Sequence, residues 1–365
     1  MAGPLEGLKV VEMAGLGPCP LAGQLLGDLG AEVTVIVRKR AKPDPADVNN
    51  RSKRSVALDL KSDAGREAAM RLIERSDILI EGFRPGVMEK LGLGPDDCAA
   101  RNAGLIFGRM TGWGQEGPLA HTAGHDLNYL SLSGALHAMG RSGEVPTPPL
   151  NLVADYGGGT MFLLLGVLSA LYERQRSGRG QVIDAAMVDG VPALMGIFHT
   201  MLARGQWNGR AREANLLDGG APFYRCYETS DGKFLSVGPL EPQFFAELVE
   251  KVGLPGDLCA SQYNLSEWAS RREAFVALFA SRTRDEWMKI FTGTDACVAP
   301  VLAFDEVMAH PHNAARSTFI KVGGVVQAAP APRFSRTPPA TPAPPVPPGA
   351  DTDRILAEIG MALED

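Results

Sequence analysis

The chain has 365 residues, of which 45% are hydrophobic and 21% charged, and its formal net charge is −6 at pH 7. This length allows two or more domains with separate cores, and the composition is that of an ordinary soluble globular protein. The acidic balance argues against nucleic acid as the main partner, because neutralising phosphates requires a basic surface. Five cysteines without a C-x-x-C pair indicate reduced thiols in a cytoplasmic setting and no zinc site.

Strand and helix patterns alternate along the first part of the chain. Five strands are predicted within residues 8–13, 31–37, 75–83, 103–110 and 178–190. Helical patterns cover residues 20–30 and 63–75, and the apolar run 161–172 is too short to span a bilayer, so we expect a buried helix there. The N-terminus shows no signal-peptide pattern, and we expect no membrane span. This alternation predicts an α/β domain over residues 1–195 with a parallel sheet covered by helices.

A second, smaller α+β domain is predicted over residues 200–315. It begins with a hairpin that turns at Asp231-Gly232, followed by amphipathic helices within residues 242–254 and 272–283. Residues 330–348 contain nine prolines and should form an extended strap, because proline cannot donate backbone hydrogen bonds. A final helix with Asp351 as its N-cap follows, so segment 330–365 should return to complete the large domain.

The first predicted strand–helix–strand unit does not fit an NAD site. The sequence AGLGPCP has Gly15 and Gly17 but Pro20 where a dinucleotide motif has its third glycine. The second strand ends in cations at 38–40, where an NAD site has an acidic residue. Further cations follow at Arg51, Lys53, Arg54, Lys61, Arg84 and Lys90. Each could be an ordinary surface charge, but together they favour a phosphorylated ribose, as in NADP or coenzyme A, and the missing glycine favours coenzyme A.

Three places carry candidate acid–base groups. His125 and Asp126 stand at a predicted helix start with Asp126 as N-cap, where a backbone N–H favours an anionic oxygen; a loop histidine beside a plain cap is the alternative. Asp155 precedes three glycines, which suggest a close approach to the backbone, and the apolar helix behind it should bury its carboxyl and raise its pKa. Glu241 precedes Pro242 at a predicted strand-to-helix turn and could equally be an exposed glutamate.

The sequence resembles the α-methylacyl-CoA racemases of the class III CoA-transferase family. Long motifs carry this resemblance over nearly the whole chain, among them AGHDLNYLSLSGAL, PPLNLVADYGGG, GRGQVIDAAMVDG, NLLDGGAPFYRCYETSDGKF and SDILIEGFRPGVMEKLGLG. The resemblance implies a Rossmann-like large domain, a small domain and an interlocked homodimer, with each site between the large domain of one subunit and the small domain of the other.

The resemblance also implies roles for particular residues. His125 and Asp155 would be the two bases, and Glu241 would pair with the histidine of the partner chain. The residues implied to bind coenzyme A or the acyl group are Arg38, Leu58, Asp59, Leu60, Lys61, Gly82, Phe83, Arg84, Lys90, Gly124, Leu127, Asn128 and Tyr129. Lys90 stands where a close relative would have arginine, which puts a planar clamp there in doubt.

The expected reaction is inversion at the α-carbon of a 2-methylacyl-CoA. One base removes the proton and the other returns it on the opposite face of an enolate, for which no metal, nicotinamide or flavin is expected. We expect the N–H of Asp126 to stabilise the enolate oxygen. The nearest alternative is a CoA-transferase with Asp126 as nucleophile. A coenzyme A-binding protein without chemistry and an NADP-dependent oxidoreductase are further alternatives.

Overall fold

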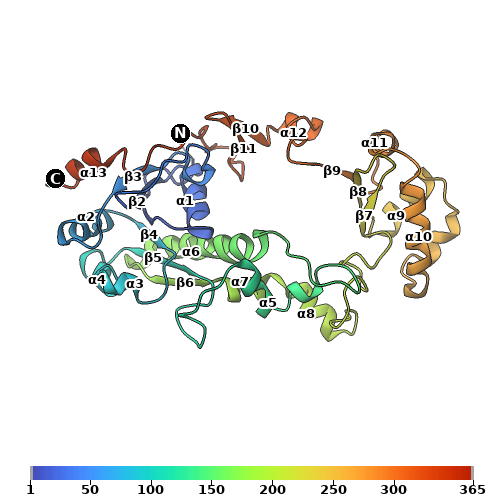
Figure 1. Cartoon of the computed structure of the whole chain (residues 1–365), viewed down its shortest axis with the longest axis horizontal. Helices are drawn as coiled ribbons and strands as arrows, with labels where there is room; N and C mark the ends of the chain where they lie inside the picture. The colour runs from blue at the N-terminus through green and yellow to red at the C-terminus, as the bar shows by residue number, and fades with distance from the viewer. Residues whose placement is uncertain (1–2, 363–365) are drawn as a thin grey trace. The chain divides into compact units, whose positions relative to one another are not determined.

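The computed structural model describes residues 3–362, and the chain divides into two units (Figure 1). The first unit contains the chain up to Ser133, Pro149–Leu194 and the chain from His312 onward; the second contains Gly134–Pro148 and Met195–Pro311. Residues 1–2 and 363–365, at the ends of the predicted large domain, lie outside the described residues.

A six-stranded parallel sheet forms the centre of the first unit, which confirms the predicted α/β class. Its strands are β1 (Lys9–Met13), β2 (Glu32–Val37), β3 (Arg54–Ala57), β4 (Ile78–Glu81), β5 (Ile106–Thr111) and β6 (Val182–Ala186). The strand order is β3-β2-β1-β4-β5-β6, with every neighbouring pair parallel, which is the Rossmann order. The order reverses between β1 and β4, so the carboxyl ends of these two strands flank the crevice where such folds bind ligands.

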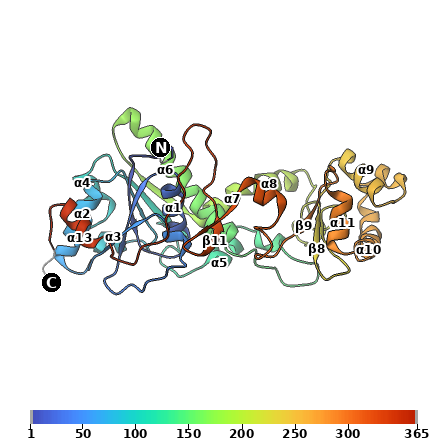
Figure 2. The ribbon, with the colours of Figure 1, turned by 90° about the horizontal axis from the view of Figure 1, so that it is seen from above.

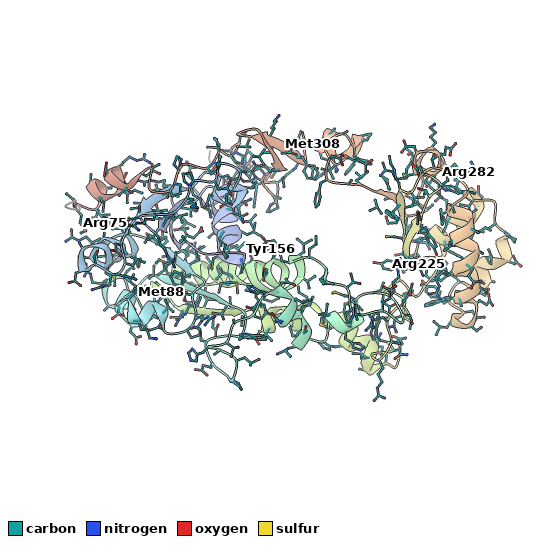
Figure 3. All side chains as sticks on the ribbon, viewed as in Figure 1. Arg75, Met88, Tyr156, Arg225, Arg282 and Met308 are labelled. Carbon is teal, nitrogen blue, oxygen red and sulfur yellow. The ribbon has the colours of Figure 1, made fainter. Side chains whose placement is uncertain are left out.

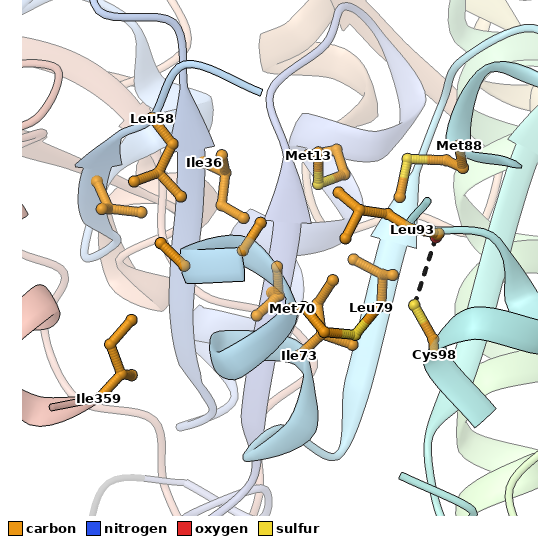
Figure 4. Close-up of a cluster of buried hydrophobic side chains, with 14 of the residues drawn as sticks. Met13, Ile36, Leu58, Met70, Ile73, Leu79, Met88, Leu93, Cys98 and Ile359 are labelled. Carbon is orange, nitrogen blue, oxygen red and sulfur yellow. Dashed lines mark hydrogen bonds between the residues drawn. The ribbon is translucent and has the colours of Figure 1, made fainter. Parts of the chain in front are cut away.

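Helices cover the sheet on both faces. They are α1 (Pro18–Asp28), α2 (Asp63–Glu74), α3 (Val87–Lys90), α4 (Pro95–Arg101), α5 (Asp126–Leu132), α6 (Met161–Ser177) and α7 (Met187–Leu194). One core cluster joins α2 to the strands through Ile36, Leu58, Ile73 and Leu79, and Ile359 of the C-terminal segment also belongs to it (Figure 4). These side chains are at most 3% exposed, so the C-terminal segment belongs to the core of the first unit.

The apolar helix is longer and less buried than the sequence predicted. A π-helical segment, Leu152–Thr160, runs directly into α6, so residues 152–177 form one helix of 26 residues. An 18-residue window of this helix has a mean hydropathy of 1.4, and 33% of that window is buried. By length and composition this helix could cross a membrane, a test that the core helix of a soluble protein also passes. One face of α6 packs on the sheet, with Leu163 against Gly108 of β5. The opposite stripe, Met161, Leu165, Leu168 and Tyr172, is exposed in the single chain.

The C-terminal segment runs along the edge strand β3. It contains α12 (Pro311–Arg316), the hairpin β10 (Phe319–Val322) and β11 (Val325–Ala328), the proline-rich stretch, and α13 (Thr352–Glu358). The Asp351 carboxylate accepts the Ser55 N–H at 3.0 Å, and the Thr352 hydroxyl accepts the Ala57 N–H at 3.0 Å. Asp351 precedes α13 as predicted, but it caps the edge of the sheet instead of its own helix. The helix α13 lies beside α2 in both Figure 1 and Figure 2.

The second unit has an antiparallel sheet of β7 (Arg225–Glu228), β8 (Phe234–Val237) and β9 (Val298–Val301). The hairpin turns at Asp231-Gly232 as predicted, and Gly232 takes a positive φ of 71° there. The helices of this unit are α8 (Gly196–Ala203), α9 (Pro242–Lys251), α10 (Trp268–Phe279) and α11 (Arg284–Phe291). An aromatic-rich core that includes Phe223, Phe279 and Trp287 joins α9, α10 and α11 to the sheet.

Residues 134–148 group with the second unit, although the sequence pattern placed them within the large domain. The half-buried Glu213 carboxylate explains this grouping, because it pairs with Arg141 at 3.1 Å and with Arg225 at 2.9 Å. It also accepts the backbone N–H of Ser142 at 3.2 Å. A sequence pattern carries no signal for such a long-range ionic contact.

Candidate active site

The candidate catalytic residues of the first unit lie at the carboxyl edge of its sheet. The loop after β1 leads through Gly17 into α1, and Gly17 adopts a positive φ of 69° as the residue before that helix. A Cβ placed on Gly17 would lie 3.5 Å from a carboxylate oxygen of Asp155. Asp155 therefore lies beside the first loop of the switch point, where the fold class places a ligand.

His125 lies at the start of α5. The helix spans Asp126–Leu132, so His125 is its N-cap and Asp126 its first residue. The helix therefore begins one residue earlier than predicted. The N–H of His125 donates to the Asn128 side-chain oxygen at 3.0 Å, which satisfies the backbone at this helix start. The imidazole itself is exposed. Because Asn128 takes over the capping role, the histidine ring is not needed to hold the helix.

The Asp126 carboxylate connects α5 to the segment that carries Asp155. Its Oδ2 accepts the backbone N–H groups of Ala154 and Asp155, both at 2.8 Å. Asp126 is 6% exposed, and its Oδ1 is buried with no hydrogen-bond partner among the described residues. The sequence predicted Asp126 as a cap for its own helix; the structure shows that its carboxylate caps the next helical segment instead.

Asp155 lies half-buried in the π-helical segment, next to Tyr156, which is labelled in Figure 3. Burial raises the pKa of the Asp155 carboxyl, and the nearby negative charge of Asp126 raises it further. A hydrogen bond from the Asn151 side chain at 3.3 Å and the proximity of His125 act in the opposite direction and lower that pKa. The structure thus brings His125, Asp126 and Asp155 together, and Asp155 has the raised pKa that was expected from its sequence context.

The three glycines after Asp155 make room for another helix of the same unit. A Cβ on Gly158 would lie 2.8 Å from the backbone nitrogen of Val191, and one on Gly190 would lie 1.9 Å from the Gly158 carbonyl oxygen. The close approach that the sequence suggested is therefore made by α7. This close packing fixes the backbone of the segment that carries Asp155 against α7.

The residues that the resemblance assigns to substrate binding have different environments. Those with exposed positions are Arg38, Asp59, Lys61, Gly82, Arg84, Lys90, Leu127 and Asn128, and Leu60, Phe83 and Gly124 are half-buried. Arg38, Lys61 and Arg84 each follow a strand, at its carboxyl end.

Two residues of that set do not offer their side chains to a ligand. Leu58 is 2% exposed and belongs to the core of the first unit (Figure 4), so only its backbone could contact a ligand. Tyr129 is 7% exposed, its hydroxyl donates to the Gly124 carbonyl, and its ring packs edge-on against Trp113 with centroids 4.7 Å apart. Burial raises the pKa of Tyr129, and Asp155 adds to this while Arg84 opposes it, so all three lie in one neighbourhood.

Two of the predicted phosphate-binding cations are internal ion pairs. Arg51 is 1% exposed; its Nε donates to Asp28 at 3.0 Å and its Nη1 to Gln327 at 2.7 Å. Lys53 is 4% exposed and donates to Glu12 at 2.7 Å. Burying these charges requires that they be paired inside the protein, so neither is available for a phosphate.

Glu241 lies in the second unit. It is exposed and precedes α9 as its N-cap residue, with Pro242 at the first helical position as predicted. Its negative charge raises the pKa of Tyr263 and of Cys297, although burial is the larger cause for both groups. Glu241 thus presents a carboxylate at the surface of its own unit.

Asn151 and Gly17 are site residues that the sequence did not reveal. Asn151 has the ordinary signature of a polar loop residue, and its contact with Asp155 depends on the π-helical turn between them. Within residues 3–362, no group of three or more histidine, cysteine, aspartate or glutamate side chains is arranged to hold a metal ion.

Comparison with known proteins identifies the family. The profile of CoA-transferase family III matches residues 5–352, so the chain belongs to this family. It is 47% identical to the alpha-methylacyl-CoA racemase of Mus musculus over 99% of this chain and 94% of that protein, and 45% identical to the Homo sapiens protein of the same name over the same shares. The crystal structure of a CAIB/BAIF family protein from Brucella suis superposes with a TM-score of 0.83 at 26% identity, covering 98% of this chain and all of that one.

Proposed function

We propose that the protein is an α-methylacyl-CoA racemase that interconverts the (2R) and (2S) forms of 2-methylacyl-CoA thioesters. The observation that carries this proposal is the convergence of His125 and Asp155 at the carboxyl edge of the sheet, where Asp126 follows His125 and its carboxylate accepts the Asp155 N–H at 2.8 Å, and where the His125 charge acts on the Asp155 carboxyl. An imidazole and a carboxyl of raised pKa are groups that can exchange a proton near neutral pH. The identity to the two named racemases supports the same assignment.

The reaction requires each base to act on one isomer. When Asp155 removes the α-proton, the electron pair of the C–H bond moves into the thioester and forms an enolate; His125 then delivers a proton to the opposite face. The reverse direction exchanges the two roles. The thioester itself acidifies the α-proton, so the proposed chemistry needs no metal or redox cofactor. We assign the N–H of Asp126 to the enolate oxygen, a contact worth about 3 kcal/mol in the transition state.

The coenzyme A part of the substrate is assigned to the exposed residues that follow the strands. Arg38, Arg84 and Lys61 carry positive charge at the carboxyl ends of β2, β4 and β3, and the flanking residue Lys90 ends α3. Guanidinium and ammonium groups in this position suit the phosphates of the nucleotide.

The main alternative in this family is transfer of coenzyme A through an acyl intermediate on Asp126. The Asp126 carboxylate is buried, and one of its oxygens is occupied by two backbone N–H groups. The other oxygen, Oδ1, accepts no hydrogen bond but is buried. A nucleophile needs an accessible oxygen, so this burial favours proton transfer by His125 and Asp155 over attack by Asp126.

The test is incubation of a single-isomer 2-methylacyl-CoA with the protein in D₂O, without any added carboxylic acid. We expect deuterium at the α-carbon together with loss of optical purity. The His125→Ala variant should lose racemisation by a factor of about 10² to 10⁴, while Asp155 retains slow exchange with one isomer. No exchange by the wild-type protein, or near-normal racemisation by the variant, would refute the assignment.

We further propose that two copies of the chain form a homodimer in which Glu241 of one copy orients His125 of the other. The exposed apolar stripe of α6, formed by Met161, Leu165, Leu168 and Tyr172, supports a protein partner, because soluble proteins rarely leave such a stripe uncovered. A carboxylate beside the imidazole would fix its tautomer and raise its basicity.

We also propose a cytoplasmic location. All five cysteines are free thiols, which supports a reducing compartment such as the cytoplasm.

The dimer proposal is tested by mixing. His125→Ala and Glu241→Ala chains should each be inactive alone, whereas random mixed dimers contain one site with both residues intact. A mixture refolded or expressed together should recover about a quarter of the wild-type rate, since half of the dimers are mixed and half of their sites are complete. Failure of the mixture to exceed the separate variants would show that both residues act within one chain.

A further inference from the structure

Arg109 of β5 lies between two glutamates from different elements. Its Nε donates to Oε1 of Glu81, the last residue of β4, at 3.1 Å. Its Nη1 and Nη2 donate to the two carboxylate oxygens of Glu89 in α3, at 2.7 and 3.3 Å. Arg109 is 7% exposed and Glu81 is fully buried. We call Glu81, Arg109 and Glu89 the Arg109 cluster.

The cluster contacts residues 82–90 at both ends. Near the start of this segment, the second oxygen of Glu81 accepts the N–H of Phe83 at 2.7 Å. Near its end, Glu89 in α3 is held by the bidentate bond to Arg109. Between these two anchors, Gly86 takes a positive φ of 81° and Arg84 is exposed at the carboxyl end of β4. The segment that carries Arg84 and Lys90 is thus attached to the sheet through Glu81 of β4 and Arg109 of β5.

The electrostatics of the cluster depend on all three members. Burial raises the pKa of Glu81 to about 7, against the opposing effect of the Phe83 N–H and Arg109. Partial burial is the largest single influence on Glu89 and raises its pKa, but the hydrogen bond and charge of Arg109, together with backbone hydrogen bonds, lower the pKa overall. A planar guanidinium can bond both acids at once, which the compact ammonium of a lysine could not do in the same geometry.

We infer that the Arg109 cluster is a positioning device that holds residues 82–90 in the conformation that binds the phosphate-bearing part of coenzyme A. This inference rests on the proposed function, which assigns coenzyme A to Arg84 and Lys90. A free loop loses backbone conformational entropy at each residue when a ligand orders it, which weakens binding. Fixing the loop before binding removes that cost from the binding step.

The cluster therefore acts on substrate affinity and leaves the chemical step to His125 and Asp155. Arg109 is buried and forms its hydrogen bonds with Glu81 and Glu89, not with the candidate bases His125 and Asp155. Breaking the contacts of the cluster should lower the affinity for the coenzyme A moiety of any acyl-CoA, whatever its acyl chain.

The test uses Glu89→Ala in the full-length protein, because Glu89 is the partly exposed member of the cluster, with 44% of its side chain accessible. The matched control is Glu74→Ala: Glu74 is 40% exposed and pairs with Arg101 at 2.9 Å on the same unit, outside residues 82–90. The measurements are the Kd of free coenzyme A by calorimetry, KM and kcat for a 2-methylacyl-CoA, and amide hydrogen exchange at Phe83 and Arg84.

We expect Glu89→Ala to raise both Kd and KM about tenfold, a change of 1.4 kcal/mol in binding, with kcat unchanged within twofold. Glu89→Gln, which keeps one hydrogen bond, should give a smaller change in the same direction. Amide exchange at Phe83 and Arg84 should accelerate in Glu89→Ala only. Glu74→Ala should leave all of these quantities unchanged.

Three results would overturn the inference: an unchanged Kd in Glu89→Ala, an equal change in Glu74→Ala, or a fall in kcat with Kd and KM unaffected. Its failure can be distinguished from failure of the proposed function. A wild-type protein that binds coenzyme A but exchanges no α-proton refutes the racemase assignment and leaves the Kd comparison valid. A wild-type protein that binds no coenzyme A overturns both.

Discussion

Two regions of the first unit differ in how their positively charged side chains are used. At the start of β3, Arg51 and Lys53 are buried, and each is paired with an acid from another element. At the carboxyl ends of the strands, Arg38 and Arg84 are exposed and form no ion pair among residues 3–362. The two regions are close in sequence and similar in composition. In this unit, the cations before β3 are paired inside the fold, whereas those that follow β2 and β4 are free for a ligand.

Carboxylates follow the same division. Asp126 is occupied by two backbone N–H groups, whereas the side chain of Asp155 receives one long hydrogen bond from Asn151. The occupied carboxylate fixes the segment, and the less occupied one has a raised pKa that suits proton transfer. Three experiments test this contrast between occupied and available charges.

The largest effect is expected for a buried cation. Lys53→Met removes the partner of Glu12, whose carboxyl is 1% exposed, and leaves an unpaired acid in the core. Breaking a buried pair in this way costs about 3–5 kcal/mol in the free energy of unfolding, measurable by urea titration. The double variant Lys53→Met with Glu12→Met should recover much of that loss, because replacing both partners by apolar groups can be nearly neutral. A loss below 1 kcal/mol in the single variant would contradict the contrast.

An exposed cation at the carboxyl edge should behave in the opposite way. Arg84→Ala should change the free energy of unfolding by no more than about 0.5 kcal/mol, as surface substitutions usually do. Its effect should be on KM for the acyl-CoA, with an increase of about tenfold and a weaker dependence of KM on salt, because a charge that binds phosphate is lost. A destabilised variant with normal KM would show that Arg84 stabilises the fold, as Arg51 and Lys53 do, and does not bind the substrate.

The smallest effects concern the pH dependence of exchange. Asp155 must be deprotonated to act as a base, so the rate for its isomer falls as the pH drops through the pKa of this carboxyl. Burial raises that pKa above its ordinary value of 3.8, the Asn151 hydrogen bond lowers it and the Asp126 charge raises it. Asn151→Ala should therefore move the acidic limb of the pH profile to higher pH, and Asp126→Asn should move it to lower pH. Shifts in the same direction in both variants would show that the limb belongs to another group.

Much of the sheet was predictable from the sequence because most of its strands are short apolar runs with valine or isoleucine that alternate with helical patterns. The strand β3 was not predicted, since it has four residues, begins with Arg54 and lies in a stretch dominated by charge. The pairing of Arg51 with Asp28 and Gln327 depends on contacts across 23 and 276 residues, which no local pattern encodes. For the same reason the cations of this stretch could not be separated in advance from those that follow the strands.

The candidate site was predictable where a residue carries its own chemical signature. His125, Asp126 and Asp155 stand out as titratable groups at helix starts, and the structure brings them together. What the sequence could not show is the use made of each group. The offset of one residue at α5, the hydrogen bonds from Ala154 and Asp155 to Asp126, and the packing of α7 against Gly158 all arise from tertiary contacts.

The attachment of Asp351 and Thr352 to the edge of β3 has a consequence for how the chain is made. The two residues of the Ser55–Asp351 contact are 296 positions apart, so the strand stays uncovered until the ribosome has added that many further residues. At about 5–20 residues per second, roughly 15–60 s pass between the synthesis of the two partners. During that interval the nascent sheet presents bare backbone N–H groups, and a prematurely terminated product would keep them. We expect ribosome-bound fragments of this protein to depend on chaperones in proportion to this delay.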